Sequence, residues 1–202
     1  MNRFMNFYLN ATSIKQVAGN CVRGFMFILP MAIIGMMLSL TTYAQDHGPL
    51  SFNLVPASDT IAACLPNAEA RVTVFPKEEI RGVDTLDLKA EGLPANTTFA
   101  VFLTESAVGS VGAVQYIGDF TTNAAGRGSL RVDTIIEEAF SSTVVGGVRV
   151  RKELNHMVIW FADPAADEFC IPGSGPSPFD GDGQAGSQVL SSRNFTQGSP
   201  LP

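Results

Sequence analysis

Short runs of alternating apolar and polar residues recur between residues 50 and 162. In the clearest of them, Leu86 and Leu88 fall on one side of the backbone, and Asp87 and Lys89 fall on the other. This alternation is typical of an antiparallel strand with one buried face. Similar runs bounded by turn residues predict further strands at 51–55, 70–75, 98–104, 114–121, 129–134, 141–145 and 148–151.

Local features refine this pattern. The run 156–162, HMVIWFA, is apolar almost throughout and predicts a central strand buried on both faces. Strands 51–55 and 70–75 are expected at sheet edges, the second because it ends at Pro76. Gly118, inside its strand, predicts a β-bulge. We further expect a loop over 59–67, one helical turn over 135–140 and irregular structure over about 165–202.

Short strands at close spacing, without a helix of useful length, indicate an all-β protein built as an antiparallel β-sandwich. No internal repeat is visible in the sequence. Residues 45–202 are enough for one domain with a sizeable core. We therefore expect a single β-sandwich domain over that range.

Residues 1–44 have the features of a secretory signal peptide. They contain three basic residues, no acid and the apolar run Gly24–Leu40. Small residues at Thr42 and Ala44 predict cleavage after Ala44. The alternative is a retained signal anchor, but the run is shorter than the roughly 20 residues of a spanning helix and contains Pro30. We expect a signal-peptide helix that is removed, a secreted, extracellular or periplasmic location, and no membrane attachment after cleavage.

Removal of this leader makes the chain more acidic. The remaining part keeps ten basic and nineteen acidic residues, a formal charge of −9. Because nucleic-acid binding requires a basic face, this balance argues against a nucleic-acid partner. We expect a protein or glycan partner instead.

Two cysteines remain after the leader, which carries Cys21. In an oxidising compartment, Cys64 and Cys170 most simply form one disulfide. The alternative is two unrelated free thiols. A cysteine-based metal site is disfavoured, because no second cysteine or histidine lies near either residue in the sequence.

The glycine-rich segment that contains Asp180 and Asp182 is the one candidate metal site. Two carboxylates two residues apart on such a loop provide the oxygen ligands that calcium prefers. Asp163, Asp167 and Glu168 would add oxygens if the fold brought them close. However, Ser191 stands where a calcium loop of the twelve-residue type has a closing glutamate. A solvated acidic turn is therefore the favoured interpretation, and no cofactor is expected.

Catalytic motifs are missing from the sequence. There is no G-x-S-x-G motif, and the chain contains two histidines, His47 and His156. A serine–histidine–acid site would have to use His156, which we instead expect at a strand edge on the surface. Adjacent glutamates at 78–79 and 137–138 point in different directions and do not form a facing pair. We assign no catalytic residue.

Aromatic residues such as Trp160 and Tyr116 provide the flat rings that stack on sugars. In strands, however, large aromatic side chains more often fill the core of a sandwich. We therefore expect these rings in the core.

Four segments carry a resemblance to a known family: GLPANTTFAVFLTE (92–105), YIGDFTTNAAGRGSL (116–130), VIWFADP (158–164) and PFDGDGQAGSQVLSSRNF (178–195). In this order they resemble uncharacterised secreted bacterial β-sandwich proteins of the immunoglobulin-like kind. The first segment is also similar to the corner that leads into a late strand of immunoglobulin-like domains, with Phe99 where those domains often have tyrosine. The resemblance implies a secreted immunoglobulin-like β-sandwich and supplies no catalytic residue.

The sequence thus favours a secreted or surface-associated, non-enzymatic β-sandwich module with a binding or structural role. Loops 105–115 and 173–187 are the expected contact surface, since exposed glycine-rich loops on a rigid scaffold commonly bind partners. The alternative function is calcium or carbohydrate binding through the loop of Asp180 and Asp182.

Overall fold

The computed structural model describes residues 48–76, 82–174, 177–178, 184–195 and 198–202. The chain divides into two units, Met1–Tyr43 and Ala44–Pro202. The predicted signal peptide and its cleavage after Ala44 lie outside the described residues. Neither helix in the described ranges has the length and hydrophobicity of a membrane-spanning segment.

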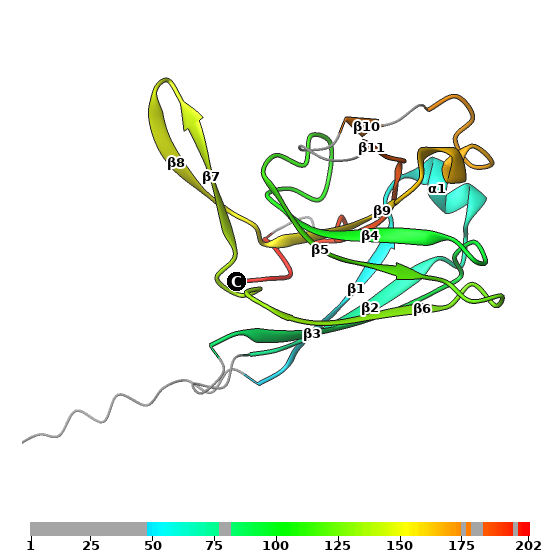
Figure 1. The fold of residues 1–202 in the computed structure, drawn as a ribbon, viewed down its shortest axis with the longest axis horizontal. Coiled ribbons are helices and arrows are strands. Elements are labelled where there is room, and N and C mark those ends of the chain that lie inside the picture. Colours follow the sequence, from blue (N-terminus) through cyan, green and yellow to red (C-terminus); the bar gives the residue numbers. More distant parts are fainter. Residues whose placement is uncertain (1–47, 77–81, 175–176, 179–183, 196–197) are drawn as a thin grey trace, which may run out of the picture. The chain divides into compact units, whose positions relative to one another are not determined.

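This part of the chain is mostly antiparallel β-structure, as the alternating pattern predicts (Figure 1). Two short helices accompany the strands, α1 (Asp59–Cys64) and η1 (Pro164–Asp167). The strands are β1 (Leu50–Pro56), β2 (Glu69–Phe75), β3 (Asp84–Glu91), β4 (Thr98–Thr104), β5 (Val114–Thr121), β6 (Gly128–Thr134), β7 (Phe140–Val145), β8 (Val148–Glu153), β9 (His156–Phe161), β10 (Ser177–Pro178), β11 (Gln184–Ala185) and β12 (Gln188–Ser191).

Eight strands form one sheet in the order β5-β4-β9-β12-β1-β2-β3-β6. β1 belongs to both halves of this sheet, because residues 50–54 pair with β2 whereas Val55 and Pro56 pair with β12. The two terminal strands of the order, β5 and β6, lie close to each other. The remaining strands form two separate ribbons, β7-β8 and β10-β11.

One hydrophobic core joins the two halves of the sheet. Leu86 and Leu88 on β3 belong to the same buried cluster as Phe99 on β4 and Phe161 on β9. The Phe99 ring lies 5.1 Å from the Phe161 ring and 5.5 Å from the Phe120 ring, centroid to centroid. Burial of each such side chain stabilises the fold by about 1.5–3 kcal/mol. The core therefore fixes the scaffold from which loops and ribbons project.

Two strand predictions are confirmed in detail. β9 lies between β4 and β12, and its residues from Met157 to Phe161 are buried on both faces. In β5, Gly118 pairs with Val101 and Tyr116 pairs with Phe102, so Ile117 is the additional residue of a β-bulge beside Gly118.

The edge positions predicted for β1 and β2 are wrong. β1 lies between β12 and β2, and β2 lies between β1 and β3. Pro76 follows the last residue of β2, so its missing N–H removes no hydrogen bond from the ladder. A proline just after a strand therefore does not require an edge position.

Three segments contain structure other than that expected. The predicted loop over 59–67 contains α1, whose first turn is capped by Ser58 Oγ accepting from the Ile61 N–H. At residues 135–139 the structure has a turn and no helix, and Phe140 begins β7. The C-terminal segment, expected to be irregular, supplies β12 to the interior of the sheet.

The predicted disulfide is present. Sγ of Cys64, at the end of α1, lies 1.95 Å from Sγ of Cys170, three residues after η1. The Arg193 guanidinium adds a contact near the same helix, because it lies 3.1 Å from the Asp59 carboxylate. These contacts tie the segment before β2 to the C-terminal part of the chain.

Candidate functional site

Asp180 and Asp182, the predicted calcium ligands, lie outside the described residues. The three carboxylates expected to assist them are described, and each accepts hydrogen bonds from groups of the protein. Asp163 accepts from the Ala165 N–H, and Glu168 accepts from the Gly173 N–H. The buried Asp167 accepts from the Ser174 hydroxyl and from the Ser187 N–H. Across the described ranges, no group of three or more histidine, cysteine or acidic side chains is arranged to hold a metal.

His156 lies at the start of β9 and is half-buried, whereas the sequence predicted a surface position. Its Nδ1 lies 3.0 Å from Oγ of Ser192. The hydroxyl also accepts from the Met157 N–H at 3.2 Å. Burial lowers the pKa of His156, which favours the neutral imidazole.

This serine–histidine pair has the residue types of a hydrolytic site but not its accessibility. The Ser192 side chain is fully buried, and its hydroxyl is used in binding β9 to the segment that follows β12. A nucleophile has to approach its substrate within contact distance. The geometry therefore fits a structural tie between two segments rather than a nucleophile and base.

The aromatic residues divide between the core and the surface. Trp160 is 3% exposed and packs edge-on against Phe102, with ring centroids 5.2 Å apart. Both rings belong to a second buried cluster, which includes Ala185 of β11 and has Val111 packed against it. Tyr116 remains 55% exposed at the margin of this cluster. The expectation of a core position is confirmed for Trp160 and is wrong for Tyr116.

The hairpin formed by β7 and β8, here called the β7–β8 hairpin, differs from the rest of the structure in its exposure. It pairs with no other strand in the described part of the chain, and Figure 1 shows it projecting away from the eight-stranded sheet. Five of its apolar side chains are exposed, with fractions from 37% to 65%: Phe140, Val144, Val145, Val148 and Val150. Contiguous exposed apolar side chains commonly mark an interaction surface.

The two faces of the β7–β8 hairpin carry different chemistry. The register pairs Val145 with Val148 and Thr143 with Val150, which places the three valines on one face. The opposite face carries the cations Arg149 and Arg151 together with the apolar side chains of Phe140 and Val144. The three valines thus form an exposed apolar patch on one face, which also carries Lys152 at the base of the hairpin.

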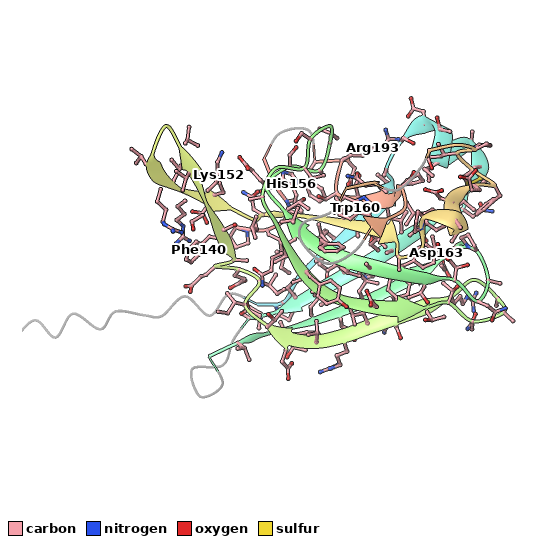
Figure 2. The ribbon with its side chains drawn as sticks, turned by 45° about the horizontal axis from the view of Figure 1, so that its top comes forward. Phe140, Lys152, His156, Trp160, Asp163 and Arg193 are labelled. Carbon is pink, nitrogen blue, oxygen red and sulfur yellow. A yellow bond between two sulfur atoms is a disulfide. The ribbon has the colours of Figure 1, made fainter. Side chains whose placement is uncertain are left out.

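The base of the β7–β8 hairpin is fixed by charged contacts. Figure 2 shows Phe140 and Lys152 on the hairpin, at a distance from Trp160 and Asp163. The Arg151 guanidinium carbon lies 3.9 Å above the centre of the Phe140 ring. Lys152 forms an ion pair with Glu105, in the segment after β4, and this contact lowers the pKa of Glu105.

A polar groove crosses the outer face of β1, β2, β3 and β6. Arg71 pairs across strands with Asn53 and with Lys89, and Lys89 pairs in turn with Ser129. The neighbouring acids Glu69 and Glu91 also line the groove, together with Arg127. These side chains are exposed and carry both signs of charge. The groove has the composition of a solvated face and offers no buried polar group to a ligand.

Comparison with known proteins gives no match for this chain. No protein-family model matches the chain, and neither curated proteins nor solved structures gave a match. The candidate site is therefore defined by the geometry of the chain alone.

The β7–β8 hairpin is the candidate site that the sequence analysis did not select. The sequence did predict both strands, at 141–145 and 148–151, on either side of Gly146 and Gly147. One feature of the sequence could have indicated the site. Valines flank the two glycines, and no longer apolar run lies beside them. Recognising this ribbon as separate required the strand pairing, since alternation alone does not say which sheet a strand joins.

Proposed function

We propose that this chain is an exported β-sandwich module of the immunoglobulin-like kind that acts by binding at a cell surface or outside the cell, without catalysis. The observation that carries the proposal is the β7–β8 hairpin, with exposed valines on a projecting ribbon. A two-stranded ribbon by itself is marginally stable in water, so a binding role gives a reason for its exposed apolar face.

Other features support export and the sandwich architecture. The predicted signal peptide directs the chain out of the cytoplasm, and the Cys64–Cys170 disulfide is consistent with an oxidising compartment. The strand groups β1-β2-β3-β6 and β5-β4-β9-β12 share one core, as the two layers of a sandwich do.

Two observations support a role without catalysis. The Ser192 hydroxyl is buried against His156, and the acidic side chains after β9 accept hydrogen bonds from backbone N–H groups. Neither set presents a reactive group to a substrate. Binding through exposed surface is then the function that the geometry fits best.

The proposal is tested with the full chain produced in its own cells. Immunoblotting of the cytoplasm, envelope and medium reports export, and cosedimentation with washed producing cells reports binding. The variant V145T/V148T/V150T replaces the valine face with side chains of the same shape, so it should lose most of the cosedimenting fraction. The control Ile135→Thr makes the same kind of change at an exposed residue outside the hairpin and should retain it.

Retention in the cytoplasm would contradict export. Equal cosedimentation of the triple valine variant and the wild-type chain would contradict binding through the hairpin. Ser192→Ala should leave binding intact, since the hydroxyl has a structural position.

A further inference from the structure

The two outer edges of the β7–β8 hairpin differ in charge. β8 carries Arg149, Arg151, Lys152 and Glu153, whereas β7, FSSTVV, carries no charged residue. Charged side chains, lysine especially, protect an edge strand from pairing with another strand. The β7 edge lacks that protection along its whole length.

The backbone groups of β7 that face outward follow from the register. The Leu154 N–H donates to the Ala139 carbonyl, so this pair belongs to the hydrogen-bonded positions of the antiparallel ladder. These positions alternate with non-hydrogen-bonded ones, and Phe140, Ser142 and Val144 are of the second kind. Their N–H and carbonyl groups therefore point away from β8, toward the open edge.

The eight-stranded sheet does not offer a comparable edge. Its two terminal strands, β5 and β6, lie close together, which is how closed sheets protect their edges. Within the described ranges, β7 and β8 pair only with each other. The uncharged edge of β7 is thus the open strand edge best suited to a partner strand.

We propose that the partner of this edge is a second copy of the same chain, bound by antiparallel pairing of β7 with β7 of the other copy about a two-fold axis at Ser142. This inference rests on the proposed function, which assigns binding to the hairpin, and names its partner. It joins two ribbons into one four-stranded sheet, with the charged β8 strands at both outer edges.

The sequence of β7 is complementary to itself in this arrangement. The outward backbone groups of Ser142 face their own copies across the axis, and Phe140 lies opposite Val144 of the second copy. An aromatic residue opposite a β-branched residue is a favourable cross-strand pair. On the other face, Ser141 lies opposite Thr143, which pairs hydroxyl with hydroxyl. No like charges meet along the new edge.

A membrane fits the hairpin less well than a second copy does. The valine face and nearby arginines have the composition of a segment that binds an anionic bilayer. However, the outward N–H and carbonyl groups of β7 would lose their water in the apolar layer without gaining a partner. Pairing with another strand satisfies those groups.

The first test measures the solution mass of the full chain, processed by its own cells, by light scattering over a range of concentrations. We expect a dimer. Ser142→Pro removes an outward N–H without removing a bond to β8, so it should halve the mass. Arg151→Pro is the matched control, because Arg151 is the cross-strand partner of Ser142 and faces the opposite edge. It should remain dimeric, and thermal melting of both variants checks that the eight-stranded sheet is intact.

The second test locates the axis by single cysteine substitutions at 141, 142, 143 and 144 under mild oxidation. Hydrogen-bonded antiparallel partners have Cα atoms about 5.5 Å apart, within disulfide range. Residue 141 and its copy would lie about 8 Å apart, because the strands are offset by two residues there. Covalent dimer should therefore form fastest with Ser142→Cys.

A monomer at every concentration overturns the inference, as does a dimer that Ser142→Pro leaves intact. Binding of the monomer to vesicles of anionic phospholipid would assign the hairpin to a membrane instead and also overturn it. A monomeric chain that still needs its valines to cosediment with cells would leave the proposed function standing and remove only the second copy.

Discussion

Nζ of Lys152, on β8, lies 2.5 Å from Oε1 of Glu105, in the segment that follows β4. Glu105 also accepts from the Ala113 N–H through its other carboxylate oxygen, at 3.3 Å. One side chain thus holds both ends of the segment 105–113 and the base of the β7–β8 hairpin. This arrangement joins the loop that the sequence selected to the ribbon that the structure revealed.

Loss of this ion pair should loosen the β7–β8 hairpin. We expect Glu105→Gln to speed amide hydrogen exchange in β7 and β8 while leaving β3 and β4 unchanged. The matched control is Glu153→Gln, which removes a carboxylate paired with Arg151 inside the hairpin. Similar exchange in both variants would contradict an anchoring role for Glu105.

The same contact should depend on pH. Lys152, as a hydrogen-bond donor, holds the pKa of Glu105 below its ordinary value of about 4.3. The resulting stabilisation is fully present above the ordinary value and is lost as the pH falls through the lowered pKa. Hydrogen exchange in the hairpin, corrected for intrinsic rates, should therefore rise in strong acid for the wild-type chain. Glu105→Gln should lack this change.

The stability of the fold should also respond to His156. Because burial lowers its pKa in the folded state, the unfolded chain binds more protons between the two pKa values. Stability is then fully present above about pH 6.5, the ordinary histidine value, and falls as the pH decreases below it. His156→Gln should flatten the melting temperature between pH 7.5 and pH 5, an interval chosen around that ordinary value. His47→Gln removes the other histidine and should preserve the wild-type slope.

Asp84 should contribute more stability than Asp87, a half-buried acid on the same strand. Its buried carboxylate accepts from the Ile136 N–H at 2.7 Å and from the Glu137 N–H at 3.0 Å. Asp84→Ala leaves these donors without their acceptor, which should cost about 2–4 kcal/mol in denaturant unfolding. Asp87→Ala breaks a surface ion pair with Arg131 and should cost about 1 kcal/mol or less. Equal costs would refute a stabilising role for the hydrogen bonds between Asp84 and the turn.

The turn at Gly92 should tolerate no side chain. Its φ is +71°, and an added Cβ would lie 2.0 Å from the Asn67 carbonyl oxygen. Gly146, in the hairpin turn, has a φ of +58° and nothing within 4 Å of such a Cβ. Both alanine variants carry the left-handed strain of about 1–2 kcal/mol. The difference between their unfolding free energies therefore measures the cost of the clash between the added Cβ at residue 92 and the Asn67 carbonyl oxygen. We expect Gly92→Ala to be clearly the less stable.

The local pattern of the sequence predicted most strands because alternation reports burial on one face. The alternation of Leu86 and Leu88 with polar residues was enough to predict β3. The apolar run of β9 was enough to predict that this strand is buried on both faces. The order of the strands in the sheet was harder to predict from the sequence. The sequence predicted β1 as an edge strand, yet its last two residues pair with β12, which is distant in the sequence.

The candidate site was predictable only in part, for the same physical reason. The Cys64–Cys170 pair followed from counting cysteines. The contact of His156 with Ser192 spans 36 residues, and no spacing rule connects them. The β7–β8 hairpin is a candidate site because its valines are exposed. The sequence alone does not show whether a valine in a strand is exposed or packed against another part of the fold.

The disulfide has a consequence for proteolysis. It joins residues 106 positions apart, and the Gly146–Gly147 turn lies inside the loop that it closes. Exposed turns are the preferred sites of proteolytic nicking. A single cut at this turn would leave both fragments joined through Cys64 and Cys170. A clipped molecule would therefore keep nearly its full mass on a non-reducing gel and separate into two pieces only after reduction.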